Sequence, residues 1–243
     1  SNPHGIDKIH SFAKKNGLRV VEDAAHAFGC SYQGKKIGSF GDIVCFSFDG
    51  IKNITSGEGG CIVTSDHKIS DYARDTRLLG VEKDTEKRFK GNRSWEFDVK
   101  HQGYRYHMSN ISASIGRAQL KKLDLVFGPK RRNIAKIYRD ELSDIKDIIF
   151  FDTNLKEQIP HIQPVRITNG KRDLLIQKLK KSNIGTGIHY KPNHLLSLYK
   201  KKHKKKLSVT EKLYSEILTL PLHPNLTKKD IIRISNQIKK VLL

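Results

Sequence analysis

Three short apolar segments in the first third of the chain constrain the fold more than any other feature of the sequence. They are residues 18–22, 43–48 and 61–65, and each has the length and composition of a β-strand. Short turns or helical patterns separate them rather than long polar linkers. Alternation of this kind predicts an α/β fold, a sheet with flanking helices, in which functional groups lie at the ends of the strands.

The segments around these strands are expected to form helices. Residues 5–16 place apolar side chains at helical spacing, and Gly17 follows where a helix would end. Asp66 is a plausible N-cap for a second helix over 67–79. The segment 18–21 is mostly apolar without alternation, which is typical of an interior strand with neighbours on both sides. We therefore expect further strands of this sheet to come from residues upstream of position 1.

The second half of the chain predicts a separate, smaller domain. Residues 81–106 are polar and irregular, as in a functional or disordered loop, and helical periodicity returns over 110–125. A Gly-Pro pair at 128–129 indicates a break before the next helix. We therefore predict a larger α/β domain over 1–127 and a small α+β domain over 128–243. Further elements expected in the second domain are strands at 148–151, 161–167 and 184–190, and helices at 171–181, 210–217 and 227–243.

The composition fits a globular protein without a membrane span. The 243 residues are 37% hydrophobic, and no apolar run approaches the roughly 20 residues that cross a bilayer. The first residues do not resemble a signal peptide, so we expect a cytoplasmic protein. Cys30, Cys45 and Cys61 lack Cys-x-x-Cys spacing, and we therefore expect reduced thiols, with neither a disulfide framework nor a metal site.

A formal net charge of +21 is the strongest bias in the composition. Alone it favours phosphate-rich partners such as nucleic acid or an anionic membrane surface. The excess lysines are scattered through the second half, however, and the dense run at 200–206 contains no aromatic residue for stacking against bases. A solvated lysine-rich surface is the favoured interpretation, while nucleic-acid binding and attraction of anionic substrates remain open.

The clearest candidate site joins two strand ends. Asp23 follows the strand at 18–22, and Lys52 lies in the glycine-rich turn after the strand at 43–48. A reactive amine and a carboxylate in one cleft suggest pyridoxal phosphate chemistry, in which the amine moves a proton and the carboxylate keeps the pyridine nitrogen protonated. Each residue also has an ordinary interpretation, Lys52 as a surface lysine and Asp23 as the cap of a following helix.

Two further side chains are candidates for the same site. Ser47 alternates with Phe46 and Phe48, so its hydroxyl can face the cleft as a phosphate ligand while the rings face the core. His26 is a candidate contact of the cofactor ring or its hydroxyl, and alternatively a partly buried helix histidine. The small-residue turn at 56–60 fits neither a P-loop nor a dinucleotide-binding pattern, and we interpret it as a turn that passes close to the cofactor.

Several of these motifs together resemble the DegT-like nucleotide-sugar aminotransferases, which are fold type I pyridoxal phosphate enzymes. The resemblance covers nearly the whole chain. It implies an incomplete fold type I large domain followed by a small C-terminal α+β domain. The matching motifs are VEDAAHA at 21–27, GSFGD at 38–42, FSF at 46–48, GEGG at 57–60, GYRYHMSNI at 103–111, GIHY at 187–190 and LPLHP at 220–224.

The resemblance implies a role for each candidate residue. Lys52 corresponds to the lysine that holds the cofactor, Asp23 to the partner of the pyridine nitrogen, and Ser47 to a phosphate ligand. His26 stands where the family usually has Gln or His near the ring hydroxyl. Some relatives carry histidine in place of the lysine and act as sugar dehydratases, so Lys52 implies amino transfer. Arg105 replaces an asparagine that in many members reaches the cofactor phosphate of the neighbouring subunit, which implies a homodimer with Arg105 at that phosphate.

The implied reaction moves an amino group from an amino acid such as glutamate to a keto sugar carried by a nucleoside diphosphate, in amino-sugar or cell-surface polysaccharide biosynthesis. Family members usually carry about a hundred or more residues before the first helix of this chain, consistent with the expected strand neighbours. Those residues supply a phosphate loop, an aromatic side chain that stacks on the ring, and part of the sugar pocket. Two alternatives remain: a noncatalytic truncated or split-gene product that needs an N-terminal partner fragment, and a basic nucleic-acid-binding module.

Overall fold

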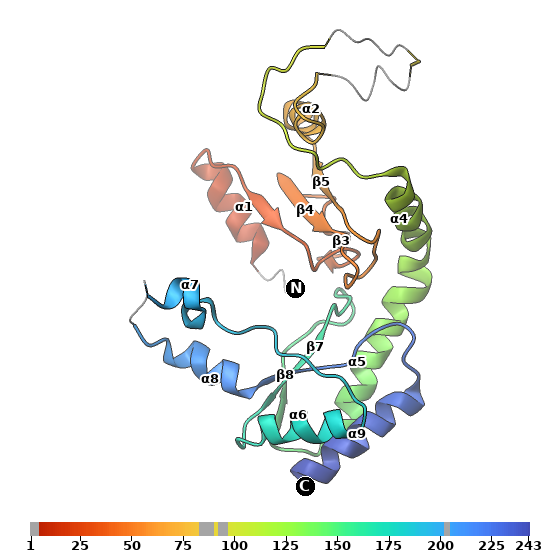
Figure 1. The fold of residues 1–243 in the computed structure, drawn as a ribbon, viewed down its shortest axis with the longest axis vertical. Helices are drawn as coiled ribbons and strands as arrows, with labels where there is room; N and C mark the ends of the chain where they lie inside the picture. The colour runs from red at the N-terminus through yellow and green to blue at the C-terminus, as the bar shows by residue number, and fades with distance from the viewer. Residues whose placement is uncertain (1–4, 83–89, 92–96, 202–204) are drawn as a thin grey trace. The chain divides into compact units, whose positions relative to one another are not determined.

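The computed structural model describes residues 5–82, 90–91, 97–201 and 205–243, and it forms two compact units, Ser1–Asp124 and Leu125–Leu243 (Figure 1). The expected irregular segment at 81–106 lies partly outside the described residues. Helices accompany a sheet that contains a parallel strand pair, which confirms the α/β class. The assignment of residues 1–127 to a cofactor-binding domain stays a prediction.

A three-stranded sheet with the order β1-β4-β5 organises the first unit. β1 runs parallel to β4 with Asp23 opposite Cys45, and β5 runs antiparallel to β4 with Gly60 opposite Ser47. The carboxyl ends of β1 and β4 therefore lie on one side of the sheet. The elements of this unit are α1 (Ile6–Lys15), β1 (Val21–Asp23), β2 (Ser31–Tyr32), β3 (Lys35–Lys36), β4 (Ile43–Ser47), β5 (Gly60–Thr64), α2 (His67–Thr76) and α4 (Asn110–Lys122).

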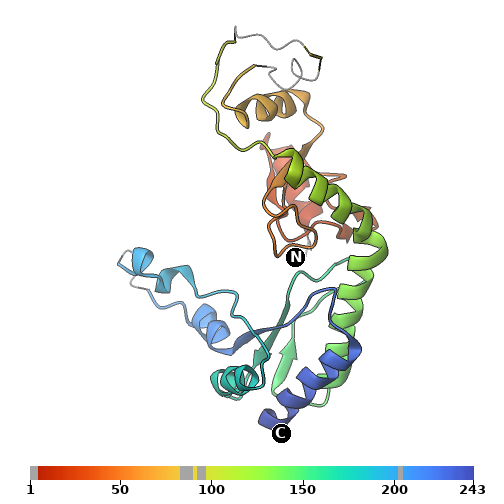
Figure 2. The same cartoon turned by 45° about the vertical axis from the view of Figure 1, so that its right-hand side comes forward.

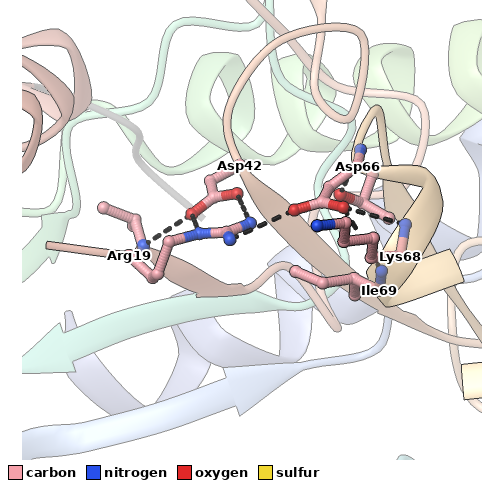
Figure 3. Close-up of polar contacts among 7 residues, drawn as sticks. Arg19, Asp42, Asp66, Lys68 and Ile69 are labelled. Carbon is pink, nitrogen blue, oxygen red and sulfur yellow. Dashed lines mark hydrogen bonds and ion pairs between the residues drawn. The ribbon is translucent and has the colours of Figure 1, made fainter. Parts of the chain in front are cut away.

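Arg19 is hydrogen-bonded to Asp42 and Asp66 at the end of the sheet opposite to Asp23 and Ser47 (Figure 3). The Arg19 guanidinium donates through Nε and Nη2 to the two carboxylate oxygens of Asp42, at 2.7 and 2.6 Å. Its Nη1 donates to Asp66 at 3.2 Å. Asp66 is also the N-cap of α2, because its carboxylate accepts from the backbone N–H groups of Lys68 and Ile69, as the sequence predicts. Arg19 thus links the entries of β1, β4 and α2.

The second unit encloses a continuous apolar core. Its antiparallel sheet has the order β6-β7-β8, and α9 packs against both α5 and α6 (Figures 1 and 2). Val165, Leu175 and Leu218 are fully buried in this core. The elements of this unit are α5 (Gly128–Leu142), β6 (Ile148–Phe150), β7 (Gln163–Ile167), α6 (Arg172–Lys181), η2 (Asn193–Leu195), α7 (Ser197–Lys200), α8 (Ser208–Glu216), β8 (Ile217–Leu220) and α9 (Lys228–Leu242).

Two expectations for the second unit are wrong. Residues 184–190 do not form a strand, and only Gly187 makes a bridge, exchanging backbone hydrogen bonds with Thr219 at 3.0 and 2.7 Å. The second expectation concerns the helix at 210–217. That helix ends at Glu216, because Ile217 is the first residue of β8, the strand that contains Thr219. Glycines weaken a strand because they supply no side chain to pack, and the apolar run 217–220 pairs with β7 instead.

The expected break at Gly128-Pro129 is also wrong. Residues 110–142 stay helical, because a π-helical turn, η1 (Leu123–Phe127), joins α4 to α5. Pro129 lies in the first turn of α5, directly after this π-helical turn, and it has no N–H to donate to a carbonyl of that turn. The first strand is also shorter than 18–22, since only Val21–Asp23 pairs with β4. No helix among the described residues is both long and apolar enough to cross a membrane.

Candidate functional site

Asp23 lies at the carboxyl end of β1, where the backbone leaves the sheet. The next residue, Ala24, still donates its backbone N–H to the carbonyl of Cys45 at 2.9 Å. The Asp23 carboxylate accepts from the backbone N–H of Ala25 at 3.0 Å, which closes a tight turn directly after the strand. The side chain itself remains solvent-exposed. A carboxylate is thus presented at the strand end rather than buried in the core.

Ser47 lies at the same end of the neighbouring strand. Val44 and Phe46 on β4 are buried, while Ser47 is half-buried, as its alternation with the phenylalanines predicts. The ring of Phe28 packs edge-on against Phe46 and Phe48, with centroid separations of 5.0 and 5.1 Å. Because β1 and β4 are parallel, Ser47 stands two residues, or about 7 Å, beyond the residue opposite Asp23.

Lys52 lies in the loop between β4 and β5, residues 48–59, which is called the excursion below. The base is fastened at Phe48, whose N–H donates to the carbonyl of Gly59 at 2.8 Å and whose carbonyl accepts from the N–H of Ser56 at 2.9 Å. Within the excursion, the N–H of Lys52 donates to the carbonyl of Asp49 at 3.0 Å, as in a β-turn. Lys52 is half-buried, which places the residue between an exposed surface position and the core.

His26 lies in the pair of turns that follows β1. The N–H of Ala27 donates to the carbonyl of Ala24 at 2.8 Å, and the N–H of Cys30 donates to that of Ala27 at 2.9 Å. The segment is not helical, so the alternatives in which Asp23 caps a helix and His26 is a helix histidine are wrong. His26 is half-buried and follows Asp23 within a single turn.

The electrostatics at the strand ends disfavour thiol chemistry. Burial raises the pKa of the Cys45 thiol, and the charge of Asp23 raises it further. Burial likewise raises the pKa of Cys61 on β5, with a smaller contribution from Cys45. Both thiols therefore stay protonated at neutral pH and are poor nucleophiles.

Arg105 lies in the segment before α4, far in sequence from the other candidate residues. It lies between Tyr104 and Tyr106, whose rings stack at 5.1 Å, and it lines a groove of about 1020 Å³ beside β5 and α2. None of the described residues that line this groove is Asp23, His26, Ser47 or Lys52. Local sequence patterns do not predict this groove, because its walls come from segments far apart in the chain.

The residues at the strand ends fit pyridoxal phosphate in the chemistry of their donors. Lys52 offers a primary amine for an aldehyde, Asp23 a carboxylate for a pyridinium nitrogen, and Ser47 a hydroxyl for a phosphate oxygen. All three follow or end the parallel pair β1 and β4 on one side of the sheet. Among the described residues, no group of three or more His, Cys, Asp or Glu side chains could hold a metal ion.

Comparisons with known proteins connect this arrangement to one family. The model of the DegT/DnrJ/EryC1/StrS aminotransferase family matches residues 2–239. An uncharacterized protein of Methanocaldococcus jannaschii is 38% identical over 251 residues, covering 99% of this chain and 64% of its own length. These matches confirm the resemblance drawn from the motifs.

Solved structures give the same result for the fold. PseC of Helicobacter pylori, an aminotransferase of pseudoaminic acid biosynthesis, has a TM-score of 0.84 at 28% identity, covering 98% of this chain and 63% of its own. The aminotransferase TlmJ of Streptoalloteichus hindustanus has a TM-score of 0.85 at 28% identity, covering 99% and 63%. The fold is therefore that of the pyridoxal phosphate-dependent aminotransferases. The chain spans less than two thirds of the length of these relatives.

Proposed function

The chain belongs to the DegT/DnrJ/EryC1/StrS aminotransferase family, and from that premise we propose that it forms the Lys52-bearing part of a pyridoxal phosphate-dependent nucleotide-sugar aminotransferase. One observation carries the proposal. Asp23, Ser47 and Lys52 follow or end two adjacent parallel strands on one side of a sheet, where α/β folds bind ligands.

The proposal gives each side chain its own role. Lys52 holds the cofactor through its amine and moves a proton to and from the substrate carbon next to the transferred nitrogen. Asp23 keeps the proton on the pyridine nitrogen, His26 contacts the ring hydroxyl, and Ser47 donates to the phosphate. Bound pyridoxal phosphate supplies a conjugated ring that accepts the electron pair left behind when that proton departs.

The proposed substrates are an amino acid donor, with glutamate the first choice, and a keto sugar linked to a nucleoside diphosphate. Arg105 is proposed to bind the cofactor phosphate of a second subunit in a homodimer. Its guanidinium has the fork geometry that suits a phosphate group, and it lines a groove whose lining does not include Lys52.

The direct test is titration of the purified chain with pyridoxal phosphate, followed by absorbance, borohydride reduction and peptide mass mapping. We expect a new near-visible band and a reduced cofactor adduct on Lys52. Lys52→Ala should abolish both, whereas Lys68→Ala, an exposed lysine on α2, should keep both. A folded, cofactor-saturated chain without a band would contradict independent catalysis.

That negative result would favour a noncatalytic chain that needs an N-terminal partner fragment. We would then repeat the titration with the N-terminal part of a relative co-expressed. Recovery of the band only in the mixture would support complementation between the two pieces. Absence of the band from the mixture as well would contradict the cofactor site itself.

The net charge of +21 favours a second candidate, a nucleic-acid-binding module. This function predicts tight binding to duplex or single strands that weakens steeply with salt and survives Lys52→Ala. Weak binding at moderate salt, measured by fluorescence anisotropy, would eliminate it.

A further inference from the structure

The side chain of Asn53, next to Lys52, connects the Lys52 excursion to the turns that follow β1. Its Nδ2 donates to the backbone carbonyl of Phe28 at 3.0 Å. Asn53 is 4% exposed, so this amide sits in the interior although its neighbour Ile51 is 63% exposed. Two candidate-site segments that are 25 residues apart in sequence are thereby held together.

The connection between the excursion and the turns after β1 is made by a side chain rather than by the backbone hydrogen bonds described above. The bonds from Phe48 to Ser56 and Gly59 close the base of the excursion, and the turn at Asp49 shapes its tip. These bonds set the shape of the excursion, but they do not join it to the β1 side of the sheet. Asn53 makes that cross-connection through a buried amide, and Ile54, which is 3% exposed, adds an apolar anchor beside it.

The carbonyl that Asn53 binds belongs to the segment carrying the other candidate groups. Phe28 lies two residues after His26, in the turns that begin at Asp23. Its ring packs against Phe46 and Phe48, so this segment is fixed to β4 as well. A displacement of Asn53 would therefore move Lys52 relative to Asp23 and His26 while leaving the strands in place.

We propose that Asn53 is a positioning residue that sets the place of the Lys52 amine relative to Asp23 and His26. The inference rests on the proposed function, because it assigns Asn53 to the same site. Its physical basis is that reacting groups must be held to within a fraction of an ångström, and that a buried amide bond to a carbonyl is costly to break.

The test compares variants of the whole chain. Asn53→Leu keeps the approximate size and removes the donor. Asn53→Asp keeps the shape and replaces the donor with a carboxylate that repels the Phe28 carbonyl. Asn16→Leu is the matched control, because the Nδ2 of Asn16 donates to the carbonyl of Phe12 at 2.8 Å, at the end of α1. Circular dichroism and thermal unfolding select the variants that fold.

The first readout needs no cofactor. Trace acetylation with mass spectrometry gives the rate of labelling at Lys52 relative to Lys68 in the same molecule. We expect both Asn53 variants to raise this ratio about threefold or more, because a loosened excursion exposes the amine, while Asn16→Leu leaves it unchanged. For Asn53→Asp the ratio should return toward the wild-type value as the pH falls, since a protonated carboxyl can again donate to the Phe28 carbonyl.

The second readout is borohydride-fixed pyridoxal phosphate on Lys52, which should fall about tenfold or more in both Asn53 variants. Unchanged incorporation, in chains whose wild type is selective for Lys52, would overturn the positioning role. If pyridoxal phosphate shows no selectivity for Lys52 in the wild type, that result counts against the proposed function. The acetylation ratio alone then tests the positioning role of Asn53. Equal acetylation ratios in the wild type and both variants would overturn the inference.

Discussion

The two units of this protein differ in how they bury apolar side chains, although they are similar in length. The second unit packs three helices and a sheet around one continuous core, and Leu175, Leu179 and Leu218 are fully buried there. In the first unit neither α2 nor α4 contains a buried residue. Ile62, in the middle of β5, is 53% exposed. The candidate chemistry therefore lies on the less tightly packed unit.

Within the described residues, the second unit is rich in buried apolar side chains, whereas the first presents polar groups at strand ends. Fully buried apolar side chains contribute most of the favourable free energy of folding, and the second unit concentrates them. The first unit presents a carboxylate, a hydroxyl and an amine at strand ends, and polar side chains such as Arg19 and Asn53 connect its segments. Three measurements sharpen or break this comparison.

The largest effect is expected from a cavity in the second unit. Leu175→Ala should lower the free energy of unfolding by about 2–5 kcal/mol, because a fully buried leucine leaves a cavity when truncated. Urea unfolding measures the loss. Leu174→Ala is the control, because its side chain is adjacent on α6 and 45% exposed. If Ile62→Ala on β5 proves as costly as Leu175→Ala, the contrast between the units does not hold in solution.

Native-state hydrogen exchange should show the next largest difference. Amides of β7 and β8, such as those of Val165 and Leu218, should be protected more strongly than that of Val63 on β5. We expect a difference of a factor of about 100, or about 2.7 kcal/mol in opening free energy. Mass spectrometry of peptides from the two sheets tests this. Equal protection would mean that both units open together.

The smallest effect concerns the Arg19 bonds in Figure 3. The hydrogen bond from Arg19 lowers the pKa of Asp42 to about 2, with a smaller lowering from the backbone N–H of Val20. A carboxyl whose folded pKa is depressed stabilises the fold at pH values above its ordinary pKa, and this contribution is lost as the pH falls toward about 2. Stability of the first unit should therefore decline between about pH 4 and pH 2.

Arg19→Gln should remove most of this decline while leaving the second unit unchanged. Exchange rates of β4 and β7 peptides, followed across that pH range, provide the measurement. Arg74→Gln is the control, because its exposed pair with Asp71 at 3.6 Å contributes little. An unaltered pH profile in Arg19→Gln would show that other carboxylates cause the decline.

The sequence alone determined the features that depend on neighbouring residues. The cap at Asp66, helix α1 and the alternation that buries Phe46 and leaves Ser47 half-buried follow from local patterns, and the structure contains all three. The consecutive motifs also identified the family, which the comparisons confirm. Local chemistry and spacing suffice for such features because a cap or a strand period involves only a few adjacent residues.

Only the tertiary structure decided which distant segments meet. It paired residues 217–220 with β7, reduced the expected strand at 184–190 to a single bridge at Gly187, and brought the Asn53 amide to the Phe28 carbonyl. An apolar run or a buried asparagine has many possible partners in a sequence. The choice depends on which pairing buries apolar surface and satisfies hydrogen bonds at the same time, and that is a property of the whole packed unit.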